Sequence, residues 1–366
     1  MEDFSLYISL KEYFNQKPWY EWDHRFKFRN SSTLNNWREE HQDKIQYYEF
    51  IQFIFFEQWK KIKVYANKKG IKIFGDIPIF VAYDSSDVWA HPDYFYLDKK
   101  GDLEYVAGVP PDEFSETGQR WGNPLYQWEV LEEQDFDWWI QRIKFSFKLI
   151  DLLRIDHFRG FEAYWRIPAE ESTAVIGKWI PGPGYKFFKT LKEKLGPLPI
   201  IAEDLGVITK EVEDLLEKTG YPGMRVLQFA FGNKKSDERV SKYLPHNYIP
   251  KTVVYTGTHD NNTTKGWFDS LPKKIQKWVL NYTGTERDNL VYNLIRLAIS
   301  SVSRICIIPL QDVLKLGEEA RMNLPGTMEG NWEWRFTWDL FNDEDIAKFK
   351  NFCQIYERDS INNVKN

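Results

Sequence analysis

Cysteine is nearly absent from this chain, which has two in 366 residues. A core of this size is stable without disulfides, so we expect none. Cys306 lies in the apolar run 305–309 and is predicted to be a buried free thiol. Residues 1–10 lack the basic start and apolar run of a secretory signal, and no apolar stretch approaches the length of a membrane span. These features predict a cytoplasmic protein that does not contact a membrane.

Several motifs and charge patterns are missing as well. The net charge is −5, so no broad nucleic-acid surface is predicted. The turn after the first expected strand reads Gly75-Asp76-Ile77-Pro78, not the glycine-rich phosphate turn of a dinucleotide fold. A Gly-x-Ser-x-Gly elbow is also absent, which argues against a serine nucleophile.

Aromatic residues, by contrast, are abundant, at 17% of the chain. Some of them must fill the core. Aromatic faces also suit the apolar side of a sugar ring, so the composition is compatible with carbohydrate binding without excluding other functions.

Helix and strand patterns alternate along most of the sequence, as in an α/β fold. We expect strands at 71–74, 150–155, 198–202, 225–230, 252–256 and 304–309, and helices at 4–14, 47–66, 136–148, 184–195, 209–218, 273–280, 286–301 and 343–356. An open doubly wound sheet would give the same pattern. Without a phosphate turn, we favour a (β/α)8 TIM-type barrel forming a single catalytic domain over 1–366. Closure usually needs eight strands, and this series has six.

Residues 83–135 interrupt the series with prolines, glycines and many aromatic side chains. Long loops at the carboxyl ends of strands commonly build the functional site. We therefore interpret this stretch as an insertion that contacts substrate, while a packed insertion without function is the alternative.

Three carboxylates each follow an expected strand: Asp156, Glu203 and Asp260. Strand ends converge at one mouth of a barrel. Arg154 lies two residues before Asp156 and therefore leaves the same face of its strand, either as a structural ion pair or as part of the site. Such carboxylates suit glycosidic bond chemistry, which needs a proton donor and a carboxylate near the sugar carbon. A divalent metal site for phosphate chemistry is the alternative, but there is no phosphate loop and no Cys/His cluster.

Several longer runs resemble one family, the 4-alpha-glucanotransferases known as amylomaltase or disproportionating enzyme. The resemblance extends from about residue 4 to Arg335 and is strongest in six runs: 75–81 (GDIPIFV), 106–112 (VAGVPPD), 118–126 (GQRWGNPLY), 154–160 (RIDHFRG), 201–206 (IAEDLG) and 256–261 (TGTHDN).

The resemblance implies a role for each carboxylate. Asp156 matches the nucleophile that forms a covalent glycosyl ester, Glu203 the acid/base, and Asp260 the third carboxylate, which binds sugar hydroxyls. Arg154 would keep Asp156 ionised, and the apolar strand before Glu203 should raise its pKa. Retention of configuration would need the carboxyl groups of Asp156 and Glu203 about 5–5.5 Å apart.

Further residues are expected to bind substrate on the same resemblance. His259 would bond sugar hydroxyls, and the other candidates are Asp76, His157, Asn123, Phe114 and Trp121. Phe114 and Trp121 lie in a run that matches the family's loop over the acceptor side. An aromatic loop there would exclude water and favour transfer over hydrolysis, although core packing remains the alternative for each ring.

The expected function is transfer of α-1,4-glucan segments from a maltodextrin donor to a glucose or maltodextrin acceptor, without a cofactor or metal. Family members have a longer N-terminal part that supplies the first two βα units, which matches the count of six strands. We therefore expect an incomplete barrel, with a complementing N-terminal fragment as a possible partner. An α-glucan hydrolase and an inactive glucan-binding fragment are the alternatives.

Overall fold

The computed structural model describes residues 2–112, 115–231, 242–327 and 329–359. Its internal contacts separate two compact units, Met1–Gly220 and Tyr221–Asn366, which are treated in turn. In the described part of the chain, no helix is both long and apolar enough to cross a membrane.

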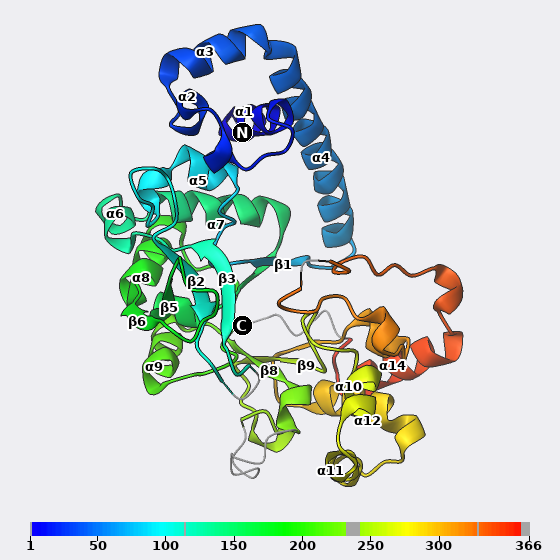
Figure 1. Ribbon diagram of the computed structural model, residues 1–366. Helices are drawn as coiled ribbons and strands as arrows, with labels where there is room; N and C mark the ends of the chain where they lie inside the picture. Colours follow the sequence, from blue (N-terminus) through cyan, green and yellow to red (C-terminus); the bar gives the residue numbers. More distant parts are fainter. Residues whose placement is uncertain (1, 113–114, 232–241, 328, 360–366) are drawn as a thin grey trace. The chain divides into compact units, whose positions relative to one another are not determined.

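The first unit contains a parallel three-stranded sheet in the order β1-β4-β7. Its first strand, β1, is labelled in Figure 1. The strands are β1 (Phe74–Ile77), β4 (Leu152–Ile155) and β7 (Ile200–Ala202). Helices α7 (Asp137–Leu149), α8 (Gly184–Leu195) and α9 (Lys210–Thr219) follow the predicted series. The helix expected at 209–218 is confirmed, with Thr209 at its N-cap and Gly220 closing it in the left-handed conformation at φ 76°.

The first expected strand, 71–74, is placed three residues too early. Ile71 and Lys72 are exposed, and the N–H of Ile73 donates to the Asp151 carboxylate at 2.8 Å instead of to a neighbouring strand. The ladder runs from Phe74, paired with Leu152, to Ile77. Asp76 therefore lies inside β1 rather than in a turn after it.

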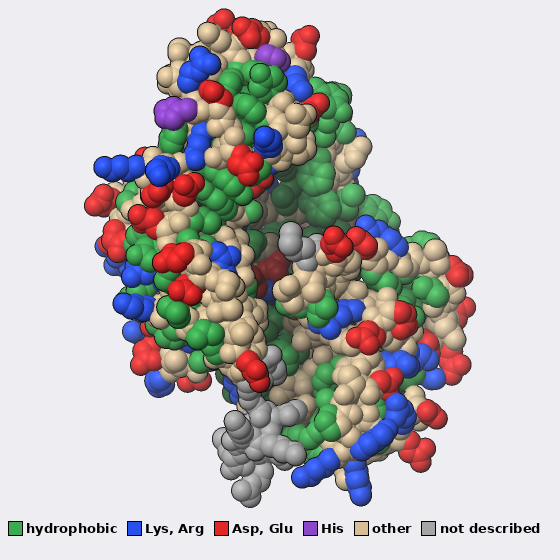
Figure 2. All heavy atoms as spheres, in the orientation of Figure 1, with side chains coloured by type: hydrophobic (Ala, Val, Ile, Leu, Met, Phe, Trp, Pro, Cys, Tyr) green, Lys and Arg blue, Asp and Glu red, His purple; other side chains and the backbone are tan. Residues whose placement is uncertain are grey.

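Four helices precede this sheet: α1 (Glu2–Tyr13), α2 (His24–Lys27), α3 (Ser31–Glu40) and α4 (Gln42–Lys68). The long helix α4 ends at Lys69 and Gly70, as predicted, and none of its residues is fully buried. Figure 2 shows hydrophobic side chains gathered over α4. Its exposed apolar residues are Tyr47, Phe50, Ile51, Phe53, Ile54, Phe55, Ile62, Val64 and Tyr65.

The predicted insertion, 83–135, contains two short helices and two strands. These are α5 (Ser86–Ala90), β2 (Tyr105–Val109), β3 (Gln119–Pro124) and α6 (Trp128–Glu133). Strands β2 and β3 join β5 (Ala163–Pro168) and β6 (Lys178–Pro181) in an antiparallel sheet of order β3-β2-β5-β6. Gly108 sits where this sheet is tightest, because a Cβ there would collide with the carbonyl of Gln119. The sequence analysis did not predict this second sheet.

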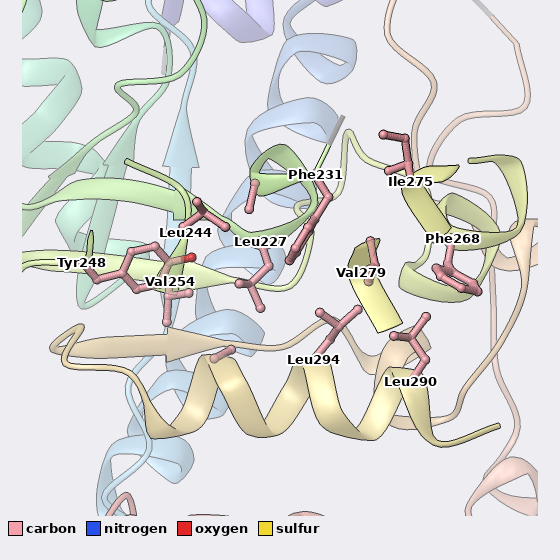
Figure 3. Packing of buried hydrophobic residues seen from close by; sticks show 12 residues of the cluster. Leu227, Phe231, Leu244, Tyr248, Val254, Phe268, Ile275, Val279, Leu290 and Leu294 are labelled. Carbon is pink, nitrogen blue, oxygen red and sulfur yellow. The ribbon is translucent and has the colours of Figure 1, made fainter. Parts of the chain in front are cut away.

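The second unit has its own parallel sheet in the order β10-β9-β8. The elements are β8 (Gly223–Val226), β9 (Thr252–Tyr255), β10 (Ile305–Ile307), α10 (Thr264–Ser270), α11 (Lys273–Thr283), α12 (Leu290–Ser300), α13 (Leu310–Val313) and α14 (Asp343–Ile355). Their apolar faces form a core in which Leu290 and Leu294 of α12 point toward Val279 of α11 (Figure 3).

Two predictions for this unit need correction. The expected strand 225–230 is instead the strand β8, ending at Val226, followed by a 3-10 turn over Leu227–Ala230. This turn buries Leu227 and Ala230 in the core, so the apolar run continues after the strand has ended. Cys306 is a free thiol, as predicted, but it is half-buried against the core rather than fully buried.

Candidate active site

Arg154 organises the carboxyl end of the first sheet. It is 6% exposed, and its guanidinium forms ion pairs with Asp156 and with Asp76, whose Oδ1 lies 3.2 Å from Nε. The register of the sheet explains the second pair, because Asp76 of β1 is the partner of Arg154 of β4. Burial lowers the pKa of Arg154, but the charges of Asp156, Asp76 and Glu203 outweigh this and raise it above its usual value.

Glu203 follows the adjacent strand, β7, and both of its carboxylate oxygens accept backbone hydrogen bonds. The N–H of His157 donates to Oε2 and the N–H of Leu205 to Oε1, each at 2.7 Å. Burial and then the charge of Asp156 raise the pKa of Glu203 to about 8, against the opposing effects of Arg154 and the two N–H groups. Glu203 is therefore a carboxyl group that can hold a proton near neutral pH.

His157 connects these groups through an unusual backbone conformation. It is left-handed, with φ 51° and ψ 50°, and its N–H is the one that donates to Glu203. Burial lowers the pKa of its imidazole to about 4, so the ring is neutral at pH 7. Its Nε2 is buried and has no hydrogen-bond partner among the residues that the structure describes, and the exposed ring of Trp121 meets the imidazole edge-on at 4.8 Å. An unpaired buried nitrogen beside an exposed aromatic ring is suited to a hydroxyl group of a ligand.

The segment after Glu203 is held by Arg159. This arginine is 5% exposed, stacks 3.7 Å above the ring of Trp179, and donates a hydrogen bond to the carbonyl of Val207. Because Leu205 lies two residues before Val207, Arg159 fixes the loop whose N–H group contacts the Glu203 carboxylate. The sequence analysis did not identify this residue, although it lies within the run 154–160.

The second unit positions His259 and Asp260 after β9. The Oδ1 of Asp260 accepts from Nδ2 of Asn323 at 2.7 Å, its main-chain carbonyl accepts from Arg321 at 2.9 Å, and its Oδ2 lies 3.4 Å from Nε2 of His259. The ring of Trp332 lies 5.0 Å from the imidazole of His259. Asn323, Arg321 and Trp332 were missed, because they lie more than 60 residues along the chain from Asp260 and no local pattern relates them to it.

The structure thus brings Asp76, Arg154, Asp156, His157, Glu203 and Trp121 together in the first unit, and His259 and Asp260 together in the second. Asn123 is half-buried and its Nδ2 donates to the carbonyl of Val81 at 2.9 Å, which anchors the chain after β1. Phe114 lies outside the described residues.

This arrangement places a group suited to acid/base chemistry beside a second carboxyl group. Asp156 is ion-paired with a buried arginine, and Glu203 has a raised pKa. Among the residues that the structure describes, no group of three or more His, Cys, Asp or Glu side chains could hold a metal ion.

Comparison with known proteins gives a consistent result. The family model described as 4-alpha-glucanotransferase matches residues 1–340. A 4-alpha-glucanotransferase of Clostridium butyricum is 48% identical over 98% of this chain and 73% of its own length. The relative from Thermus thermophilus is 46% identical over 98% of this chain and 72% of its own length.

A solved structure is also similar to this chain. The amylomaltase from Streptococcus agalactiae in complex with acarbose is 42% identical, with a TM-score of 0.93 over 97% of this chain and 72% of that one. These similarities imply an α/β fold of the TIM type, as predicted.

Proposed function

Because the chain belongs to the 4-alpha-glucanotransferase family, we propose that it transfers segments of α-1,4-glucan from a maltodextrin donor to the 4-hydroxyl of a glucose or maltodextrin acceptor. One observation supports this most directly: Asp156 is paired with a buried arginine, while the neighbouring Glu203 has a pKa raised to about 8. Two carboxyl groups in such different environments suit a nucleophile and an acid/base.

The reaction would be a double displacement. An oxygen of Asp156 attacks the anomeric carbon of the donor and forms a covalent glycosyl ester, while Glu203 gives its proton to the departing 4-oxygen. Glu203 then takes the proton of the acceptor 4-hydroxyl, whose oxygen attacks the anomeric carbon and releases Asp156. Asp260 and His259 would bind hydroxyls of the sugar at the cleavage point, and Asn323 would orient the Asp260 carboxylate.

The remaining predicted residues would bind substrate around this centre. Asp76 orients Arg154, and the unpaired Nε2 of His157 is available to a sugar hydroxyl. Trp121, with Phe114 and Asn123 in the same insertion, would hold the acceptor sugar and exclude water. Exclusion of water favours transfer over hydrolysis of the glycosyl ester.

We also propose that the two parallel sheets belong to a single barrel domain over 1–366. Three strands in each sheet make six, and closure usually needs eight. Among the described strands of these two sheets, β1, β7, β8 and β10 each have one unpaired edge, and α4 presents an apolar face to solvent. A polypeptide that supplies two βα units, such as the N-terminal part of a relative, is the proposed partner for these surfaces.

Incubation of the purified protein with maltotriose tests the function. Transfer gives glucose together with a ladder of longer maltodextrins, whereas hydrolysis gives glucose and maltose alone. Asp156→Asn should abolish turnover while acarbose binding, measured by calorimetry, persists. Near-wild-type turnover by this variant would rule out Asp156 as the nucleophile.

The assay repeated with the N-terminal part of a relative tests the proposed partner, which should raise activity or thermal stability.

A further inference from the structure

A buried carboxylate outside the proposed catalytic trio contacts both ends of the loop that holds Asp260. Asp312 lies on α13 and is 1% exposed. Its Oδ2 accepts from the hydroxyls of Thr256 at 2.5 Å and Thr264 at 2.6 Å, and its Oδ1 accepts from the N–H of Thr264 at 2.7 Å. Thr256 follows β9 directly, and Thr264 is the first residue of α10.

The loop between these threonines, 257–263, carries His259 and Asp260. From the geometry we infer that Asp312 is a positioning residue for Asp260: one side chain fixes where the loop leaves the sheet and where it enters the helix. This inference rests on the proposed function of Asp260 and extends it to a residue without contact to the sugar.

The energetics of the contact support a positioning role. Both threonines are buried, at 1% and 0% exposure, and burial raises the pKa of Asp312 although its hydrogen bonds to Thr256 and Thr264 oppose this. A buried carboxylate is costly unless its oxygens are well hydrogen-bonded, so the three donors must stay in place. Movement of either loop end would remove at least one hydrogen bond from this buried carboxylate, which disfavours displacement of the loop.

Other contacts also hold this loop, and one of them reaches its start, where the N–H of Gln228 donates to the carbonyl of Thr256 at 3.3 Å. Buried Gln228 donates to the carbonyl of Asn262 at 2.9 Å, and Oδ1 of Asn261 accepts from the N–H of Thr258 at 2.8 Å. Asp312 adds to these contacts from a different strand–helix unit, and its one carboxylate contacts both ends of the loop.

The test compares Asp312→Ala with two controls in the full chain. Asp312→Ala removes all three contacts and should lower kcat for maltotriose transfer about 10- to 100-fold, because small displacements of a catalytic group have effects of this size. Asp312→Asn retains the shape, and its amide can donate to the threonine hydroxyls, so it should recover most of kcat. Val279→Ala removes buried methyl groups from the core of the same unit, so it controls for a general loss of protein stability. This variant should leave kcat near wild type.

Two further measurements separate this inference from the proposed function. Asp312→Ala should increase hydrogen exchange at residues 256–264, and Val279→Ala should not; this readout does not depend on activity. Asp312→Ala should also weaken acarbose binding in the wild-type background and have no effect in an Asp260→Asn background.

If Asp312→Ala does not fold, Thr264→Val removes one donor and should give smaller changes in the same directions. A loss of kcat no larger than that of Val279→Ala, or unchanged hydrogen exchange, would overturn the inference.

Discussion

Arg154 and Asp76 are register partners on neighbouring parallel strands, and their ion pair joins Nε to Oδ1 at 3.2 Å. The same guanidinium pairs with Asp156, so the proposed nucleophile is held by an arginine that is itself held from the adjacent strand. Two carboxylates on one buried arginine also keep that arginine charged. The strand register therefore determines the orientation of the guanidinium that pairs with Asp156.

Replacement of Asp76 by Asn should lower kcat about 10-fold, which is less than the effect of about 100-fold for a full ångström of misplacement. The amide keeps the shape but loses the charge that orients the Arg154 guanidinium. Steady-state kinetics with maltotriose provide the measurement. Asp151→Asn is the matched control, because Asp151 directly precedes β4, at the end opposite Asp156, and contacts Lys63. If both variants keep wild-type kcat, the proposed support of Arg154 by Asp76 is wrong.

The raised pKa of Glu203 predicts a pH-dependent rate. The acid/base must be protonated for the first step, so kcat/KM should fall as pH rises through about 8. Glu203→Gln should lose turnover at every pH, since the amide cannot transfer the proton. A pH profile of the wild-type protein with the midpoint of its alkaline limb near 5 would contradict the assignment of Glu203 as the acid.

Stability should depend on pH for the same reason. Because the folded pKa of Glu203 lies above the ordinary value of 4.5, the native state binds the proton more tightly than the unfolded chain between these pH values. The contribution of Glu203 to the free energy of unfolding is thus full below pH 4.5 and decreases up to about pH 8, by at most about 1.4 kcal/mol per pH unit. Chemical denaturation at several pH values should show a shallower decline for Glu203→Gln than for wild type; equal declines would contradict the raised pKa.

Much of this site could be predicted from the sequence because its strands end in charged residues. Asp156, Glu203 and Asp260 could each be placed after an apolar strand, and the structure places them there. The three-residue error at β1 arose because Ile71 and Ile73 are as strand-like as the residues that follow them. The N–H of Ile73 bonds to the Asp151 carboxylate and not to a neighbouring strand, so the ladder begins only after Ile73. These two residues lie 78 positions apart, and no local pattern relates them.

The missing predictions all depend on contacts between distant segments. Strand β2 pairs with β5 about 60 residues later, and Asn323 reaches Asp260 across 63 positions. Helical and strand periodicities describe one segment at a time, so they contain no information about such pairs. Asp312 follows the last expected strand, but no sequence pattern predicts its contacts with Thr256 and Thr264.

Trp121 should determine whether the glycosyl ester reacts with water or with an acceptor sugar. Its ring is 38% exposed and contacts the edge of His157, so Trp121→Ala opens the neighbourhood of Glu203 to water. We expect the ratio of hydrolysis to transfer to rise several-fold, measured as reducing ends released per transfer product from maltotriose. Arg120→Ala on the same strand is the control, because Arg120 contacts the carbonyls of Ala169 and Glu171 instead. An unchanged ratio in Trp121→Ala would remove this residue from acceptor control.

Arg159→Lys should shift the alkaline limb of the pH profile upward. Lysine keeps the charge but lacks the plane that stacks on Trp179, so the loop at Val207 would loosen. The N–H of Leu205 then donates less well to Oε1 of Glu203, and loss of a donor to the ionised form raises its pKa. A hydrogen bond to a charged group contributes about 1.5–3 kcal/mol, so partial loss predicts a shift of roughly one pH unit.

The control for this shift is Arg166→Lys. Arg166 lies in β5 of the antiparallel sheet that also contains Trp179, and it stacks on Tyr105 at 4.4 Å. It should affect thermal stability about as much as Arg159→Lys and leave the alkaline limb in place. A purely structural role for Arg159 would lower stability in both variants without moving the limb in either. A shift confined to Arg159→Lys would instead link the stacked guanidinium to the protonation of the acid/base through the loop that both contact.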